Sequence, residues 1–176
     1  MNTNPRIYIA CLAAYNNGKL HGKWIEANQD VSNIWADVSA MLKASPEQNA
    51  EEWAMHDYEG FAGIRFSECP DFACISIIAR LLEEHGEAFA LWYSNQDGQN
   101  IDAEELEEKF LEQWQGAHDS ESSFADYLLD QTGQLSQLPE WARNYFDFES
   151  YARDLRLGGD YSFVSHNAQV YVFSNY

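Results

Sequence analysis

The chain has 176 residues, of which 45% are hydrophobic and 15% aromatic, so it can bury a core and is not a disordered acidic tail. It carries 29 acidic residues against 10 lysines and arginines, a formal net charge of −19. A surface of this sign repels nucleic acid and anionic membranes and attracts basic surfaces. We therefore expect neither nucleic acid nor a membrane as a partner.

The cysteines and the longest apolar run predict a cytoplasmic protein. Cys11, Cys69 and Cys74 are odd in number and have no paired spacing, which argues against a disulfide framework and favours buried, inert thiols. The apolar run at residues 7–15 is far shorter than the ~20 residues of a membrane span, and it resembles a strand more than a signal peptide.

The first sixty residues predict a ββαβ domain, residues 1–61. Residues 7–15 are strand-like, Asn17-Gly18 is a strong hairpin signal, and residues 20–26 supply the returning strand. Asp30 can cap a helix whose apolar positions, from Val31 to Leu42, recur at helical spacing. A third strand follows at residues 52–58, and the helix is expected to cover one face of the sheet.

Residues 62–100 predict a central helical domain. Pro70 suits the first position of a helix that Gly86 stops, and a second helix follows at residues 87–94. Residues 95–100 read as a loop, in which Gly98 could be the turn glycine of a calcium loop. That register puts Tyr93 at the first ligand position, so the calcium pattern fails.

Residues 101–176 predict an acidic domain of helices and short antiparallel strands. Asp102 and Glu105 have the spacing of a capping box, and the next helix should bury a stripe of apolar residues: Leu106, Phe110, Leu111 and Trp114. Further helices are expected at 122–132, stopped by Gly133, and at 139–157, with a break near Asp147. Two strands should surround Asn167. The predicted class is α+β, in three small subdomains.

The sequence lacks the motifs of common enzymes and metal sites. The five histidines are scattered without metal-ligand spacing, and there is no nucleophile elbow, P-loop or dinucleotide-binding turn. His56 beside Asp57 is the best acid/base candidate, yet a histidine between Trp53 and Tyr58 in a strand is more typical of a structural group. We expect no catalytic residue, no metal and no cofactor.

The acidic residues concentrate toward the C-terminus by this division. Residues 1–60, 61–100 and 101–176 carry net charges of −4, −4 and −11. At a helix start the dipole favours Asp102, Glu104 and Glu105 by roughly 0.3 to 1 kcal/mol each. Glu108 and Glu112 instead form like-charge pairs at i, i+4, which cost ~0.2 to 0.5 kcal/mol each. The excess of acidic residues continues beyond this one helix, and this favours a surface that imitates DNA phosphates.

Such a mimic needs more than one helix. Duplex DNA carries one charge per ~1.7 Å of its axis, whereas an i, i+4 stripe gives one per ~6 Å. Two chains would carry about −38, the charge of ~65 Å of duplex. The predicted phosphate-mimicking carboxylates are Glu83, Glu84, Glu87, Glu104, Glu105, Glu108, Glu112, Asp119, Glu121, Asp126 and Asp130. The alternative is an acidic binding module that sequesters another basic DNA-binding protein.

Three long blocks of the sequence carry a resemblance to a known family: PRIYIACLAAYNNGKLHGKWIEA, EEWAMHDYEGF and LLDQTGQLSQLPEWARNYFDFESYARDL. They resemble the ArdA antirestriction proteins of conjugative plasmids and transposons. The resemblance implies an elongated, dimeric DNA mimic of three small domains. It would block type I restriction-modification enzymes by occupying the DNA groove of their methyltransferase core.

The resemblance also implies a dimer interface. The family's antirestriction motif corresponds to residues 128–141 here, which makes Leu128, Leu135, Leu138 and Trp141 the expected homodimer contacts. Periodicity alone would place Leu135, Leu138 and Trp141 in the core. The family supplies no catalytic residues.

Overall fold

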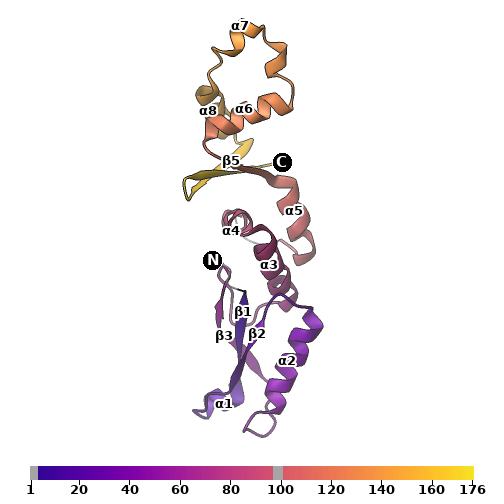
Figure 1. The fold of residues 1–176 in the computed structure, drawn as a ribbon. Helices are drawn as coiled ribbons and strands as arrows, with labels where there is room; N and C mark the ends of the chain where they lie inside the picture. Colours follow the sequence, from indigo (N-terminus) through magenta and orange to yellow (C-terminus); the bar gives the residue numbers. More distant parts are fainter. Residues whose placement is uncertain (1–3, 97–100) are drawn as a thin grey trace. The chain divides into compact units, whose positions relative to one another are not determined.

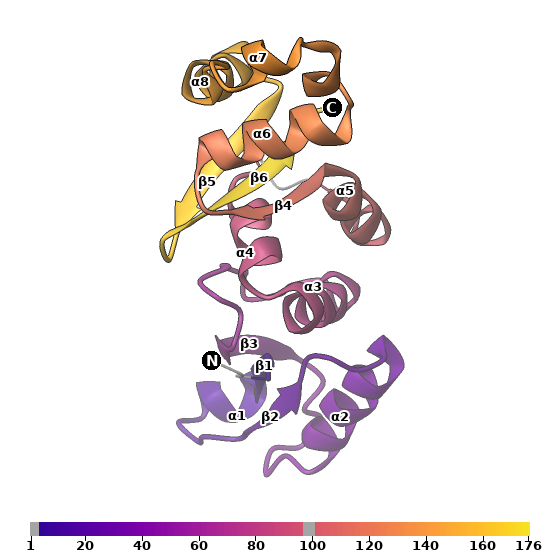
Figure 2. The same cartoon turned by 45° about the horizontal axis from the view of Figure 1, so that its top comes forward.

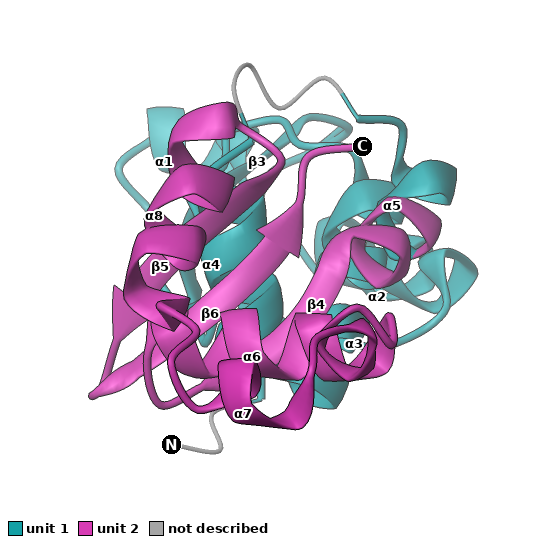
Figure 3. Ribbon diagram, turned by 90° about the horizontal axis from the view of Figure 1, so that it is seen from above, with its two compact units in different colours: residues 1–107 teal, residues 108–176 magenta. Residues whose placement is uncertain are grey.

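The computed structural model describes residues 4–96 and 101–176. Its contacts divide the chain into two compact units, residues 1–107 and 108–176 (Figure 3). The described residues contain two three-stranded antiparallel sheets and eight α-helices, which confirms the α+β class (Figure 1). The division into three domains stays a prediction.

Unit 1 is built on a sheet with strand order β2-β1-β3, antiparallel throughout. The strands are β1 (Arg6–Cys11), β2 (Gly22–Glu26) and β3 (Trp53–Glu59). Helix α2 (Val31–Lys43) packs on β1 and β2 and buries Ile34, Val38 and Met41 against the sheet, as its helical spacing predicts (Figure 1). Asp30 precedes α2 as predicted, but its side chain makes no capping hydrogen bond.

The connection between β1 and β2 differs from the prediction. The two strands do pair, with Arg6 opposite Glu26, but a two-residue turn at Asn17-Gly18 is wrong. β1 ends at Cys11 and the short helix α1 (Leu12–Asn16) follows, since leucine and alanine favour helix. Gly18, at φ +73°, ends the helix, and the Lys19 N–H donates to the Ala14 carbonyl at 2.9 Å.

Two helices follow the sheet in unit 1, α3 (Phe72–His85) and α4 (Glu87–Ser94). Asp71, rather than Pro70, sets the start of α3, because its carboxylate accepts a hydrogen bond from the Ala73 N–H at 2.9 Å. Gly86, at φ +55°, separates the two helices, which confirms the predicted stop. The predicted loop at residues 95–100, whose calcium pattern fails, includes residues 97–100, which lie outside the described residues.

All three cysteines are free, but they differ in exposure. Cys11 is buried, Cys74 is half-buried and Cys69 is exposed, so the prediction of buried thiols is wrong for Cys69. Cys69 lies in the loop just before α3, and its side chain is open to solvent. Burial raises the pKa of the Cys74 thiol and, with Cys74 beside it, raises the pKa of Tyr93 to about 12.

The acidic helix is shorter than predicted. It consists of the 3-10 turn η1 (Ala103–Glu105) and helix α5 (Leu106–Gln113), and the Asp102 side chain makes no capping hydrogen bond. Leu106 and Phe110, four residues apart, are buried, whereas Leu111 is 51% exposed and is wrongly placed in the stripe. Trp114 belongs to the next strand and stacks on Phe110, with ring centroids 6.1 Å apart.

Unit 2 is built on a second sheet, with strand order β4-β6-β5. Its elements are β4 (Trp114–His118), α6 (Glu121–Gln131), η2 (Leu135–Gln137), α7 (Glu140–Arg143), α8 (Phe148–Gly158), β5 (Tyr161–His166) and β6 (Gln169–Ser174). Figure 2 shows α6 and α8 side by side over one face of this sheet. The core between them contains Phe124, Leu155, Val170 and Val172.

The ends of the unit 2 elements follow local signals. Ser120 and Ser123 form a capping box at the start of α6, and Asp147 caps α8 by accepting from the Ser150 N–H at 2.9 Å. The β5–β6 hairpin turns at Asn167 and Ala168, both at positive φ, which confirms the predicted strand pair. β4 was not predicted, because it is short and contains a bulge before Gly116.

Candidate carboxylate surface

The eleven predicted phosphate-mimicking carboxylates lie at the surface of both units. Ten are exposed, and Glu121 is half-buried. Unit 1 holds Glu83, Glu84, Glu87, Glu104 and Glu105, and unit 2 holds Glu108, Glu112, Asp119, Glu121, Asp126 and Asp130. Exposure is a necessary condition for a contact surface, and ten of the eleven meet it in full.

In unit 1, two segments bring acidic residues together. Glu83 and Glu84 lie in the last turn of α3, where the helix dipole disfavours negative charge. Glu104 and Glu105 lie in η1, which contacts α3. Glu83 accepts a hydrogen bond from the Asn28 side-chain amide. The helix dipole therefore disfavours Glu83 and Glu84 at the end of α3, whereas it favours Glu104 and Glu105 ahead of α5.

Arg80 stands between these two segments. Its guanidinium donates to both carboxylate oxygens of Glu107, Nη1 to Oε1 at 3.1 Å and Nη2 to Oε2 at 2.7 Å. The same Nη1 lies 3.4 Å from Oε2 of Glu84. These hydrogen bonds hold the pKa of Glu107 below its usual value and raise that of Arg80. Sequence reasoning missed Glu107 as Arg80's partner, because the two are 27 positions apart.

In unit 2, the carboxylates are on α5, on the loop before α6 and on α6 itself. Asp126 and Asp130 are exposed and one turn apart, on the opposite side of α6 from buried Phe124 and Leu129. Glu121 is engaged by Arg156, whose Nη1 lies 2.8 Å from Oε1. Glu121 is thus partly neutralised within the chain, unlike the exposed positions that follow it on α6.

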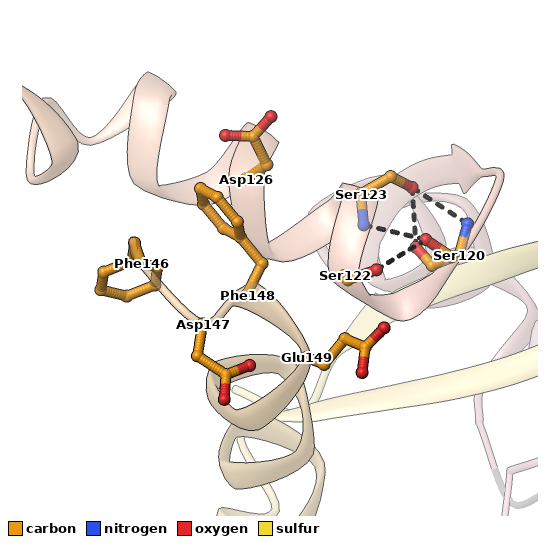
Figure 4. Close-up of a pocket in the computed structure, with 8 residues that line it drawn as sticks. All are labelled: Ser120, Ser122, Ser123, Asp126, Phe146, Asp147, Phe148 and Glu149. Carbon is orange, nitrogen blue, oxygen red and sulfur yellow. Dashed lines mark hydrogen bonds between the residues drawn. The ribbon is translucent and has the colours of Figure 1, made fainter. Parts of the chain in front are cut away.

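A hollow of about 430 Å³ lies between the starts of α6 and α8 (Figure 4). It is lined by Ser120, Ser122, Ser123, Asp126, Phe146, Asp147, Phe148 and Glu149. Hydrogen bonds from the Ser150 backbone and side chain hold the pKa of Asp147 below its usual value. The serine hydroxyls bond to one another and to the start of α6. No histidine is among the eight residues that line the hollow, and the hydroxyls of Ser120 and Ser123 are already engaged in the hydrogen bonds that begin α6.

The remaining candidates for chemistry are also surface features. His56 is exposed, occupies the bulge of β3 opposite Tyr8 and Ile9, and its ring packs edge-on against Tyr15 at 4.8 Å. Within residues 4–96 and 101–176, no group of three or more potential ligands is placed to hold a metal ion. Among the helices of those same residues, none combines the length and the apolarity of a membrane span.

A partly exposed apolar region adjoins α6 in unit 2. A cavity of about 590 Å³ is lined by Leu129, Gln134, Leu135, Gln137, Leu138, Phe146 and Tyr151. Trp141 on α7 is 73% exposed, and Tyr145 just after it is 84% exposed. Arg143 fixes the backbone here by donating to the carbonyls of Leu138 at 3.0 Å and Ser136 at 2.9 Å. Exposed aromatic side chains of this size are typical of protein contacts.

The family comparison covers nearly the whole chain. Residues 7–170 match the family model described as "Antirestriction protein (ArdA)". The chain belongs to the ArdA family. The match spans both units and confirms the resemblance carried by the N-terminal and C-terminal blocks. ArdA proteins are antirestriction proteins, inhibitors rather than enzymes. A search of curated proteins found no match.

The expected ArdA dimer contacts coincide with the apolar region. Leu135 and Leu138 line the cavity, Leu128 is half-buried on α6, and Trp141 projects from α7. Periodicity alone placed Leu135, Leu138 and Trp141 in the core, and that interpretation is wrong, because none of them is buried. Their role as homodimer contacts stays a prediction. Tyr145 is a residue that sequence reasoning missed, since an aromatic side chain in a helical stretch normally indicates burial.

Proposed function

We propose that this ArdA-family protein inhibits type I restriction-modification enzymes by presenting carboxylates in place of DNA phosphates. The target is the DNA-binding groove of the methyltransferase core, which must be lined with basic side chains to hold DNA. The observation that carries the proposal is the exposure of ten predicted carboxylates, spread over α3, α4, η1, α5, α6 and the β4–α6 loop, in a member of an antirestriction family.

Charge density requires that many carboxylates act together. A stripe on one helix supplies one charge per ~6 Å, against one per ~1.7 Å in duplex DNA. The acidic residues of several segments, and of a second copy, would make up the difference. We propose a homodimer joined through Leu135, Leu138 and Trp141, because their burial would offset the repulsion between two chains of −19 each. Its target being a DNA enzyme, the protein would act in the cytoplasm.

Competition with DNA tests the proposal directly. A labelled duplex bound to a purified type I methyltransferase is titrated with the protein, and fluorescence anisotropy follows release of the DNA. We expect displacement that weakens as salt rises, because charge pairs form the contact. DNA binding that is indifferent to excess protein would exclude the proposed mechanism. Displacement of DNA from an unrelated basic DNA-binding protein with equal efficiency would favour the alternative, a general acidic binding module.

A further inference from the structure

Arg80 forms an unusually complete set of contacts for a surface cation. Its planar guanidinium meets Glu107 with two parallel hydrogen bonds, at 3.1 and 2.7 Å, and reaches Glu84 at 3.4 Å. Glu84 lies one turn farther along α3, whereas Glu107 lies in the first turn of α5. A lysine could not reproduce the two parallel hydrogen bonds, because its ammonium is a single point of charge.

The two segments that Arg80 joins are both acidic. Glu83 and Glu84 lie in the last turn of α3, and Glu104 and Glu105 lie in η1, just before the start of α5, whose second residue is Glu107. α3 and η1 contact each other, so the two acidic segments are neighbours, and charges act over ~8 Å at physiological salt. Like charges at this range repel. A cation between the two segments reduces this repulsion, and Arg80 bonds to a carboxylate on each side.

We propose that Arg80 is a positioning residue of the inhibitory surface. By bridging Glu84 and Glu107, it holds the carboxylates of α3 and η1 at a fixed separation, ready for the basic groove of the partner. The inference rests on the proposed function, since it assigns a role to that same surface. It also means that one cation of this strongly acidic chain increases its resemblance to DNA instead of reducing it.

Replacing Arg80 should weaken binding to the methyltransferase, which is the opposite of what net charge alone predicts. Arg80→Met removes a positive charge, so a mimic that depends on net charge alone should bind the methyltransferase more tightly. If Arg80 positions the surface, binding should weaken by about two- to fivefold, the population shift that loss of one exposed ion pair allows. The matched control is Arg153→Met, which changes the charge equally. Arg153 is 58% exposed and lies 3.8 Å from its neighbour Asp154.

Three further measurements separate positioning from a general structural effect. Arg80→Lys keeps the charge but loses the two parallel hydrogen bonds to Glu107. Its affinity should lie between those of the native protein and Arg80→Met. Adding Glu107→Gln to Arg80→Met should cost little more, since both remove one contact. Amide hydrogen exchange should become faster in residues 103–107 of Arg80→Met and stay unchanged in Arg153→Met.

The outcomes are distinguishable. Equal affinities for Arg80→Met and Arg153→Met, or additive losses with Glu107→Gln, would overturn the role of Arg80 even if the native protein competes with DNA. If the native protein does not compete with DNA, the proposed function is refuted. Hydrogen exchange then still tests whether Arg80 holds η1 in place. Unchanged exchange in residues 103–107 of Arg80→Met would then refute it.

Discussion

Reversing the charge of Glu108 and Glu112 on α5 tests whether the position of the carboxylates matters. Both side chains are exposed, and E108K/E112K changes the net charge from −19 by four units. One charge pair across ~6 Å of water is worth ~0.7 kcal/mol. Losing two attractions and gaining two repulsions then costs about 3 kcal/mol. Salt near 0.15 M screens roughly half of this, so we expect about tenfold weaker competition with DNA.

Folding should be almost unaffected by this double substitution. The like-charge pair between Glu104 and Glu108 becomes favourable, whereas the pair between positions 108 and 112 stays like-charged, and each is worth only ~0.2 to 0.5 kcal/mol. The melting temperature checks this point. A loss of inhibition would therefore report on the contact surface and not on unfolding.

The matched control is E51K/E52K, which changes the net charge equally. Glu51 and Glu52 are exposed and precede β3, in a segment that holds none of the eleven predicted carboxylates. The anisotropy competition is run for both variants at two salt concentrations. If the control loses as much inhibition as E108K/E112K, only net charge counts. A complete loss in E108K/E112K would contradict a distributed surface, and no loss would remove α5 from it.

Three predictions concern the fold itself. Ser120→Ala removes the cap of α6 and should cost ~1 kcal/mol in urea unfolding; an unchanged midpoint would mean that the box with Ser123 contributes nothing. Because burial raises the pKa of Tyr93 to about 12, its share of stability is complete below pH ~10 and is lost toward pH 12, by about 2 kcal/mol. Tyr93→Phe should flatten that loss, and parallel pH profiles would refute the assignment. Phe124→Ala should cost ~3 to 5 kcal/mol on thermal unfolding, and a loss below ~1 kcal/mol would contradict its central place in unit 2.

Strong local signals predicted most elements of the fold. The spacing of Ile34, Val38 and Met41 predicts α2, and Gly86 predicts the boundary between α3 and α4, because these signals act over one or two turns. The prediction of a hairpin at Asn17-Gly18 was wrong, because the turn signal competes there with a helix-favouring run. A helix-favouring run ahead of Gly18 turned the glycine into a helix stop. β4 has too few apolar residues for its sequence pattern to predict a strand.

The candidate surface was predictable in its composition but not in its organisation. Sequence alone identifies the carboxylates as polar side chains that belong at the surface, and the exposure of Glu108 and Asp126 agrees with this. It cannot show that Arg80 meets Glu107, since that contact depends on how α3 packs on η1. Nor can periodicity distinguish the exposed Trp141 from a core tryptophan, because burial depends on which neighbour covers the helix.

The division into units changes where the negative charge lies. Residues 102–107 belong to unit 1, which holds 18 acidic and 6 basic residues, a net −12, whereas unit 2 holds 11 and 4, a net −7. The charge therefore follows chain length instead of gathering at the C-terminus. A partner that recognised only unit 2 would meet the charge of ~12 Å of duplex, about a third of a helical turn. The whole chain carries about as many charges as one full turn, so both units must contribute if the protein is to replace DNA in a groove.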